Sequence, residues 1–320
     1  MTTLEINLDL PPQERWHFAA QYTQEINEII ACYWVDIEDY LELIEVYLED
    51  YKTVFISKDF WEEIKGLAKY CAYTADQILI ANLYYDIVKF AFACTAFAVE
   101  VNGHIYHARN LDWWTENDVL KTHTKIFKFT RAGKTIFQSV GWIGFVGVLS
   151  GMKPNAFSVT LNAIVSDEVP NMGKPIAFLL REVLEGTYTF QQAKTILEET
   201  TLIGDCLLLL AGVKREELCV IERTPTQKVT RTTQETFILV TNDYKGMVQD
   251  SKNQSALKET SCGRYEQTKF LLEQRTPSGA KACFDVLSDK DVKMTITVQQ
   301  MVFNTSLGLV ECRAGRVELL

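Results

Sequence analysis

The sequence predicts a layered α+β fold, with two packed, largely antiparallel sheets, helices outside them and a mainly helical N-terminal segment before them. Three observations predict it. Helical spacing of apolar residues dominates up to Phe90, and strand-like segments alternating with pairs of helices fill the remainder. Asn102-Gly103 is a strong signal for a two-residue type I′ turn, because both central residues need a positive φ, and it predicts a β-hairpin directly after the helical part.

The elements before Phe90 follow from apolar spacing and capping residues. Residues 4–10 alternate apolar and polar side chains and predict a short strand, which Pro11-Pro12 ends. Ser57 is a favourable helix N-cap, and Thr74 with Gln77 forms a capping box. Helices are therefore expected at roughly 13–33, 36–52, 57–72 and 74–90.

The elements after Ala91 come in blocks. The helix expected from Pro175, a favourable first residue, closes near Gly186, and a second opens at Thr189. The polar stretch 246–261 lacks periodicity and predicts a surface loop. Strands are expected at 94–101, 104–110, 125–130, 135–141, 156–162, 206–212, 217–223, 228–232, 236–241, 294–302 and 307–313, with two late helices at 262–274 and 280–288.

Composition limits the class of protein. The 320 residues suffice for one large domain or two modest ones, and 47% apolar with 23% charged residues is typical of soluble globular proteins. A net charge of −10 without a basic stripe argues against nucleic-acid binding. The N-terminus has no apolar core of a secretory signal, and the apolar runs are too short to span a membrane, so we expect a cytoplasmic location.

The cysteines and histidines do not indicate a metal site. Eight cysteines are scattered without a C-x-x-C pair, which favours a reducing compartment and mostly buried thiols. His104 and His107 are three apart on a predicted strand and so face opposite sides of it. We therefore expect neither a metal nor another cofactor.

The predicted hairpin brings reactive groups together. A two-residue turn at Asn102-Gly103 places Ala96 opposite Arg109. Cys94 lies two residues before Ala96, so its thiol and the Arg109 side chain share one face. Asp112 follows just past the end of the second strand. A thiol, a guanidinium and a carboxylate are thus expected at one end of the hairpin.

Cys94 is the candidate nucleophile, although an isolated cysteine is more often a core residue. Arg109 could raise its thiolate population. His107 lies roughly 13 Å along the hairpin, too far to take the thiol proton. A cut between Ala93 and Cys94 would create an α-amine with a pKa of about 7.7–8.0 beside the thiol, where Asp112 could orient it.

Other candidates have structural alternatives. Trp113, Trp142 and Phe145 are either ordinary core or an apolar trough for an acyl chain beside the nucleophile. Asn242, after the predicted strand FILV, is either a turn residue or a donor to the oxyanion of acyl transfer. Arg264 carries no signal by itself.

Several blocks of the sequence resemble the acid ceramidase and N-acylethanolamine acid amidase family. These are cysteine enzymes of the N-terminal-nucleophile (Ntn) superfamily, related to choloylglycine hydrolases. The most specific block is G-H-x-x-H-x-R-N-x-D after Cys-Thr, and the others are LEINLDLPPQERW, GFVGVLSGMKPNAFSVTLN and LVTND.

The resemblance implies an αββα Ntn-hydrolase sandwich made as a precursor and cut before the cysteine. Residues 1–93 would form a mainly helical, α-subunit-like segment, and residues 94–320 the sandwich. By carry-over, Cys94 is nucleophile and, through its amine, base. Arg109 and Asp112 are site residues beside it, Asn242 is an oxyanion donor and Arg264 a supporting cation.

Three features depart from the family pattern. Ala163 stands where relatives carry an acidic residue, Asp243-Tyr244 follows Asn242 in reversed order, and Asp86 stands where glutamate is usual.

The expected function is hydrolysis of the linear amide of an N-acyl lipid, with the two fragments remaining associated and transient contact with a lipid surface. One alternative is a bile-salt, penicillin or acyl-homoserine-lactone amidase. The other is a non-catalytic lipid-binding relative, which Ala163 and the Asp243-Tyr244 order favour.

Overall fold

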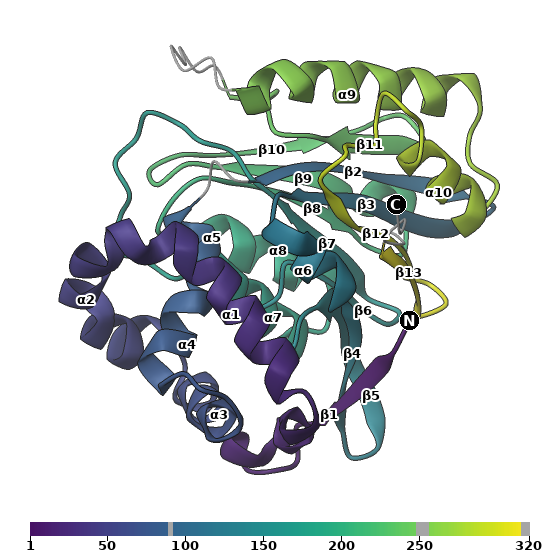
Figure 1. The fold of residues 1–320 in the computed structure, drawn as a ribbon. Coiled ribbons are helices and arrows are strands. Elements are labelled where there is room, and N and C mark those ends of the chain that lie inside the picture. Colours follow the sequence, from purple (N-terminus) through teal and green to yellow (C-terminus); the bar gives the residue numbers. More distant parts are fainter. Residues whose placement is uncertain (89–91, 248–255, 315–320) are drawn as a thin grey trace.

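The computed structural model describes residues 1–88, 92–247 and 256–314. Two β-sheets lie face to face, and helices cover the outer face of each (Figure 1). Small side chains on one sheet, including Ala96 and Ala98, meet Leu207 and Leu209 on the other, which lets the sheets pack closely. The layers follow the order helix, sheet, sheet, helix, as predicted.

The larger sheet has eight strands. Each neighbouring pair is antiparallel except the first, in which β1 runs parallel to β4. In spatial order the strands are β1 (Thr3–Asn7), β4 (Lys125–Arg131), β5 (Lys134–Gly141), β6 (Ser150–Lys153), β7 (Phe157–Asn162), β8 (Cys206–Ala211), β9 (Leu218–Arg223) and β10 (Lys228–Thr232).

The smaller sheet has five antiparallel strands and contains the predicted hairpin. Asn102 and Gly103 both have positive φ, 51° and 80°, as the type I′ turn requires. In spatial order the strands are β11 (Phe237–Val240), β2 (Phe92–Val101), β3 (His104–Trp113), β12 (Thr297–Asn304) and β13 (Leu309–Ala314).

Two pairs of helices cover the sheets. The first pair, α7 (Ile176–Gly186) and α8 (Phe190–Glu199), packs on the eight-stranded sheet. The second, α9 (Ala256–Gln274) and α10 (Ala280–Leu287), packs on the five-stranded sheet. Short elements connect the strands: η7 (Glu116–Asp118), α6 (Val119–Thr122) and η8 (Arg215–Glu217).

The N-terminal helices share one core cluster with the outer face of the eight-stranded sheet (Figure 1). Ser57 accepts a hydrogen bond from the Phe60 amide, and Thr74 and Gln77 form both bonds of the capping box, as predicted. The elements are η1 (Pro12–Glu14), η2 (His17–Gln21), α1 (Thr23–Ile37), η3 (Glu38–Tyr40), α2 (Leu41–Asp50), η4 (Tyr51–Phe55), α3 (Lys58–Leu67), η5 (Ala68–Tyr70), α4 (Ala75–Asn82) and α5 (Tyr84–Ile87).

Several predicted boundaries were wrong. The long helices break into shorter pieces, and those predicted over 13–33 and 74–90 are interrupted, the latter at Leu83. Strand β6 was missed because four residues within a glycine-rich run are too short for a periodic signal. The loop prediction fails for residues 256–261, which belong to α9, while 248–255 lie outside the described residues. Pro175 is the N-cap of α7, one residue before the first turn.

Buried charges link the N-terminal helices to the rest of the chain. Glu63 on α3 is fully buried and accepts two hydrogen bonds from Arg181 on α7, at 2.6 and 2.7 Å. Arg15 and the indole of Trp16 also donate to this carboxylate. A division of the chain into 1–93 and 94–320 would therefore separate parts that are joined by the β1–β4 pairing and by this buried ion cluster.

We expect Glu63→Ala to destabilise the uncut chain by about 3–5 kcal/mol, because it leaves the buried guanidinium of Arg181 without its counter-charge. Denaturant unfolding in a Cys94→Ala background measures this. Glu62→Ala is the matched control, since Glu62 pairs with Lys65 at the surface and its loss should cost less than about 1 kcal/mol. Equal destabilisation by both substitutions would contradict the prediction.

Candidate active site

The hairpin register places the thiol beside the guanidinium. Residues of β2 and β3 pair as predicted, with Ala96 opposite Arg109 and Cys94 opposite Leu111. Arg109 Nη2 lies 3.2 Å from Cys94 Sγ and donates to it. Both side chains are about 1% exposed, so the charge acts in a water-poor environment.

Arg109 is fixed by the opposite sheet. Its Nη1 donates to the Leu149 carbonyl at 3.1 Å and to the Ser150 hydroxyl, and its Nη2 also donates to the Leu161 carbonyl. The Cys94 thiol itself lies 3.9 Å from the Leu161 carbonyl oxygen. The thiol therefore lies between the two sheets, where β2 meets β7 and the start of β6.

Asn242, just after β11, holds the backbone nitrogen of Cys94. Its Oδ1 accepts from the Cys94 amide at 2.9 Å and from Arg264 Nη2 at 2.8 Å. Its Nδ2 donates to the Ala163 carbonyl at 2.7 Å, and its own amide donates to the Ser261 hydroxyl. The amide that would become the α-amine after a cut before Cys94 is thus already bound by a side chain.

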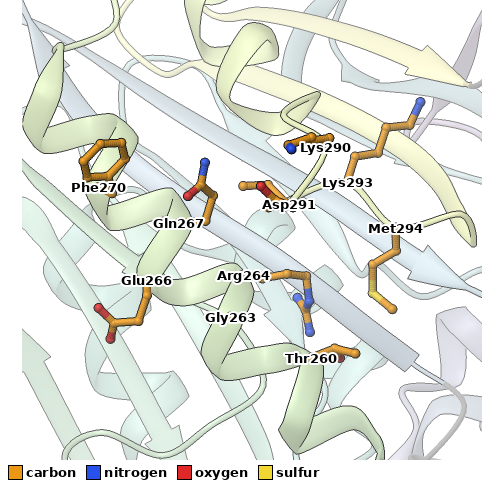
Figure 2. A pocket seen from close by; sticks show the side chains of 11 residues that line it. Thr260, Gly263, Arg264, Glu266, Gln267, Phe270, Lys290, Asp291, Lys293 and Met294 are labelled. Atoms are coloured by element: carbon orange, nitrogen blue, oxygen red, sulfur yellow. The ribbon is translucent and has the colours of Figure 1, made fainter.

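Arg264 approaches from α9 on the opposite face of the five-stranded sheet. Its Nη1 donates to the Cys94 carbonyl and, at 2.9 Å, to the Thr95 hydroxyl. Figure 2 shows this side chain pointing from α9 toward the strands. It also lines a pocket of about 710 Å³ between α9 and residues 290–294, whose walls carry Lys290 and Lys293 as well as acidic side chains. This pocket therefore lies on the side of the sheet away from the thiol.

Asp112 lies within β3 rather than past its end, because the Trp113 amide continues the ladder by donating to the Ile296 carbonyl. It is opposite Ala93, so its side chain faces away from the thiol. The prediction that Asp112 lies past the end of the second strand is thus wrong. The three groups lie at the same end of the hairpin, but the sheet separates the carboxylate from the thiol.

The Asp112 carboxylate is fully buried, and the Thr297 hydroxyl donates to one of its oxygens. Burial raises the pKa of Asp112 to about 6, even though Arg264, the Thr297 hydrogen bond and Arg109 favour the charged form. This group can therefore change its charge within the range of mildly acidic pH.

The predicted cleavage point lies inside a continuous strand. Ala93 and Cys94 are both buried in β2, where they pair with Asp112 and Leu111. His107 lies further along the hairpin, and its two ring nitrogens bond Ser158 and Thr160 at 2.9 Å each. Burial lowers its pKa to about 3, so it stays neutral and held by hydroxyls. The uncut site thus contains no imidazole beside the thiol among the described residues.

The three predicted substrate-binding rings form one cluster on the thiol side. Trp113 lies 5.6 Å from Trp142, edge to face, and Trp142 lies 6.4 Å from Phe145. All three side chains are buried. Trp113 is also covered by Tyr33 and Tyr84 of the N-terminal helices, at 5.3 and 5.0 Å. In the uncut chain these rings are therefore packed as core.

Sequence reasoning missed the groups that support these side chains. Ser150 and the Leu161 carbonyl contact Arg109, and Thr297 contacts Asp112. Ser150 and Leu161 lie in the block GFVGVLSGMKPNAFSVTLN, but nothing in the sequence singled out these three residues. Asn162, next to Leu161, is fully buried and donates to two carbonyls at the end of β11. Only the resemblance of the segment ending in T-L-N pointed near this region.

The described ranges contain no cluster of three or more His, Cys, Asp or Glu side chains arranged to hold a metal ion. Among residues 1–88, 92–247 and 256–314, no helix is long and apolar enough to cross a membrane.

The chain is similar to known proteins over most of its length. The family model described as acyl-coenzyme A:6-aminopenicillanic acid acyl-transferase matches residues 99–305. The acid ceramidase of Balaenoptera acutorostrata scammoni is 30% identical over 350 residues, covering 96% of this chain and 84% of that relative. The chain belongs to the acid ceramidase and N-acylethanolamine acid amidase family.

Further relatives support this membership. Human acid ceramidase is 27% identical over 355 residues, with the same coverage of 96% and 84%. A solved Caenorhabditis elegans N-acylethanolamine-hydrolyzing acid amidase ortholog has a TM-score of 0.56 and 25% identity, and covers 67% of this chain and 94% of its own. The predicted family, the Ntn-hydrolase sandwich and the class of enzyme, a hydrolase of linear amides, are thereby confirmed.

The raised pKa of Asp112 gives a stability prediction. A carboxyl that binds its proton more tightly in the folded chain stabilises the fold at low pH and loses this contribution as pH rises from about 4 to about 6. In an uncut Cys94→Ala background, Asp112→Asn should therefore become more stable relative to its parent over that range, by up to about 3 kcal/mol.

Denaturant unfolding at several pH values measures the difference between the two proteins. Asp285→Asn, at an exposed surface pair with Lys281, is the control and should show little change. A pH-independent difference between Asp112→Asn and its parent would contradict the expected titration.

Proposed function

We propose that the chain is an autoprocessed cysteine amidase that hydrolyses the amide bond of N-acyl lipids, of the ceramide or N-acylethanolamine type, to a fatty acid and an amine. The observation that carries this proposal is that Cys94 is hydrogen-bonded at both its thiol and its backbone nitrogen. Its thiol accepts a hydrogen bond from Arg109 Nη2 at 3.2 Å, and its backbone nitrogen donates to Asn242 Oδ1 at 2.9 Å. A cut before Cys94 would turn that nitrogen into a base beside its own thiol.

The cut itself uses the same thiol. Attack of Cys94 Sγ on the Ala93 carbonyl carbon transfers the acyl group from nitrogen to sulfur, which breaks the peptide C–N bond and frees the Cys94 amine once it takes up the thiol proton. Water then hydrolyses the thioester, which releases the Ala93 carboxylate and returns the thiol. Arg109 favours the thiolate, while Asn242 and Arg264 hold the Cys94 nitrogen and carbonyl oxygen in place. This supports cleavage between Ala93 and Cys94.

Turnover would follow with balanced proton transfers. The Cys94 amine takes the thiol proton, and the thiolate attacks the substrate carbonyl to form a tetrahedral intermediate. Asn242 Nδ2 has two N–H groups, of which the recorded hydrogen bonds use one, so the other can donate to the oxyanion. The protonated amine then gives its proton to the leaving nitrogen, and water hydrolyses the thioester to the fatty acid.

The remaining groups would support the reacting atoms from both faces of the five-stranded sheet. Asp112, buried beside Ala93 on the other face, would face the new amine once the chain before Cys94 has moved. Arg264 would keep Asn242 oriented through its hydrogen bond to Oδ1. Trp113, Trp142 and Phe145 supply an apolar surface on the thiol side that suits an acyl chain.

The two fragments would remain associated after the cut. Neither the β1–β4 pairing nor the Glu63–Arg181 ion pair involves the cleaved bond. An N-acyl lipid must also be taken from an aggregate or bilayer, so a transient contact with a lipid surface belongs to this proposal.

The first test is the mass of the chain. We expect the wild type, held at mildly acidic and at neutral pH, to yield fragments of 1–93 and 94–320, and Cys94→Ala to stay whole, because only the thiol can start the acyl shift. Intact-mass analysis reads this directly, followed by a panel of N-acyl lipids, bile-salt conjugates and acyl-homoserine lactones.

A wild type that remains one chain and hydrolyses no amide would overturn the proposal. Lipid retained without turnover, and equally by Cys94→Ala, would instead indicate a non-catalytic lipid-binding protein.

Asn242→Asp separates the two ends of the Asn242 side chain. It keeps an oxygen for the Cys94 amide and Arg264 but removes the Nδ2 donor. We expect kcat toward N-acyl amides to fall by about 10²–10³-fold, the usual effect of losing one oxyanion donor. Steady-state kinetics on processed protein measures it, with Asn171→Asp, near the surface, as control. An unchanged kcat would remove Asn242 from the oxyanion site.

A further inference from the structure

Residues 142–149, between β5 and β6, carry two of the three candidate acyl-binding rings, and we call this segment the acyl loop. Trp142 and Phe145 lie at its start and middle. At its end, the Leu149 carbonyl accepts a hydrogen bond from Arg109 Nη1. The loop thus joins the apolar surface to the guanidinium beside the nucleophile. Whatever fixes its backbone also fixes the shape of the space that an acyl chain would enter.

Asn82, the last residue of α4, is hydrogen-bonded to the middle of the acyl loop. Its Nδ2 donates to the Gly144 carbonyl at 2.9 Å, and its Oδ1 accepts from the Val146 amide at 2.6 Å and the Gly147 amide at 3.4 Å. A further Nδ2 bond, to the Ile78 carbonyl at 2.8 Å, holds the side chain on its own helix. Asn82 is 1% exposed, so each of these bonds lies away from water.

A second buried contact reaches the same loop from α7 and depends on the N-terminal helices through an ion pair. Arg181, held by Glu63 of α3, donates from Nη1 to the Val146 carbonyl at 2.9 Å. Val146 is therefore fixed at both its amide, by Asn82, and its carbonyl, by the Glu63–Arg181 pair.

The loop has little space in which to adjust. A Cβ on Gly147 would lie 2.8 Å from the Ala177 Cβ, so the backbone packs directly against α7. Gly144 has φ +93° and packs against Ile26 of α1. A close-packed, hydrogen-bonded loop of this kind keeps one conformation only while its buried partners remain.

We propose that Asn82 is a positioning residue for the acyl-binding surface, so that the N-terminal helices form part of the substrate site and set its preference for acyl-chain length. This deepens the proposed function and rests on it. Asn82 contacts the backbone that carries Phe145, and none of its recorded hydrogen bonds goes to Cys94, Arg109 or Asn242. Its loss should therefore change how a long acyl chain binds more than how the amide reacts.

Asn82→Asp is the sharpest variant, because it keeps the acceptor for the Val146 amide and replaces the donor to Gly144 by an oxygen that repels that carbonyl. We expect KM for long-chain N-acyl amides to rise about tenfold or more, with kcat for short-chain amides unchanged. Asn171→Asp, whose amide bonds the Pro225 carbonyl far along the chain, is the matched control. Glu63→Gln, which weakens the second contact, should shift chain-length preference in the same direction.

Hydrogen exchange provides a readout that does not depend on activity. In Asn82→Asp the amides of residues 142–149 should exchange faster than in the wild type, while those of β7 keep their protection. Unchanged exchange in the acyl loop, or an equal loss of short-chain and long-chain turnover, would overturn the positioning role. A wild type that hydrolyses no amide would defeat the proposed function instead, and the exchange result would still decide whether Asn82 fixes the loop.

Discussion

The site depends on one buried guanidinium. Arg109 lies on the nucleophile hairpin, yet the Leu149 and Leu161 carbonyls and the Ser150 hydroxyl of the opposite sheet receive its hydrogen bonds. These bonds satisfy both terminal nitrogens of the buried guanidinium, which lowers the free-energy cost of its burial. The same contacts aim Nη2 at the Cys94 thiol, so the interaction that joins the two sheets also orients the guanidinium on the candidate nucleophile.

The five-stranded sheet divides the site into two halves. The thiol, Arg109 and the aromatic cluster lie on its inner side, whereas Asp112 and Arg264 lie on the side of α9. The backbone at Cys94 lies between these halves, because its nitrogen bonds Asn242 and its carbonyl bonds Arg264. A base made from that backbone nitrogen can use both halves at once, which a side-chain histidine on either face could not.

Local chemistry made much of the fold predictable, and long-range packing explains the rest. The Asn102-Gly103 turn set the hairpin register, so the pairing of Cys94 with Arg109 followed from strand alternation alone. The same alternation would place Asp112 on the other face, but the predicted strand ends at residue 110, before Asp112. The last pairings of β3 depend on contacts with β12 and the residue before it, nearly two hundred residues away in the sequence. Asn82, Ser150 and Thr297 could not be found from sequence, since only tertiary contacts give them a role.

The N-terminal helices are better understood as part of the hydrolase than as a covering segment. Strand β1 completes the edge of the eight-stranded sheet, Glu63 neutralises a fully buried arginine of α7, and Asn82 bonds the loop between β5 and β6. Each of these contacts joins residues before position 93 to residues after it, and none uses the bond before Cys94. A break in that bond would free a chain end and leave these three contacts in place. The contacts that join the two parts of the chain are therefore separate from the peptide bond that the proposed chemistry breaks.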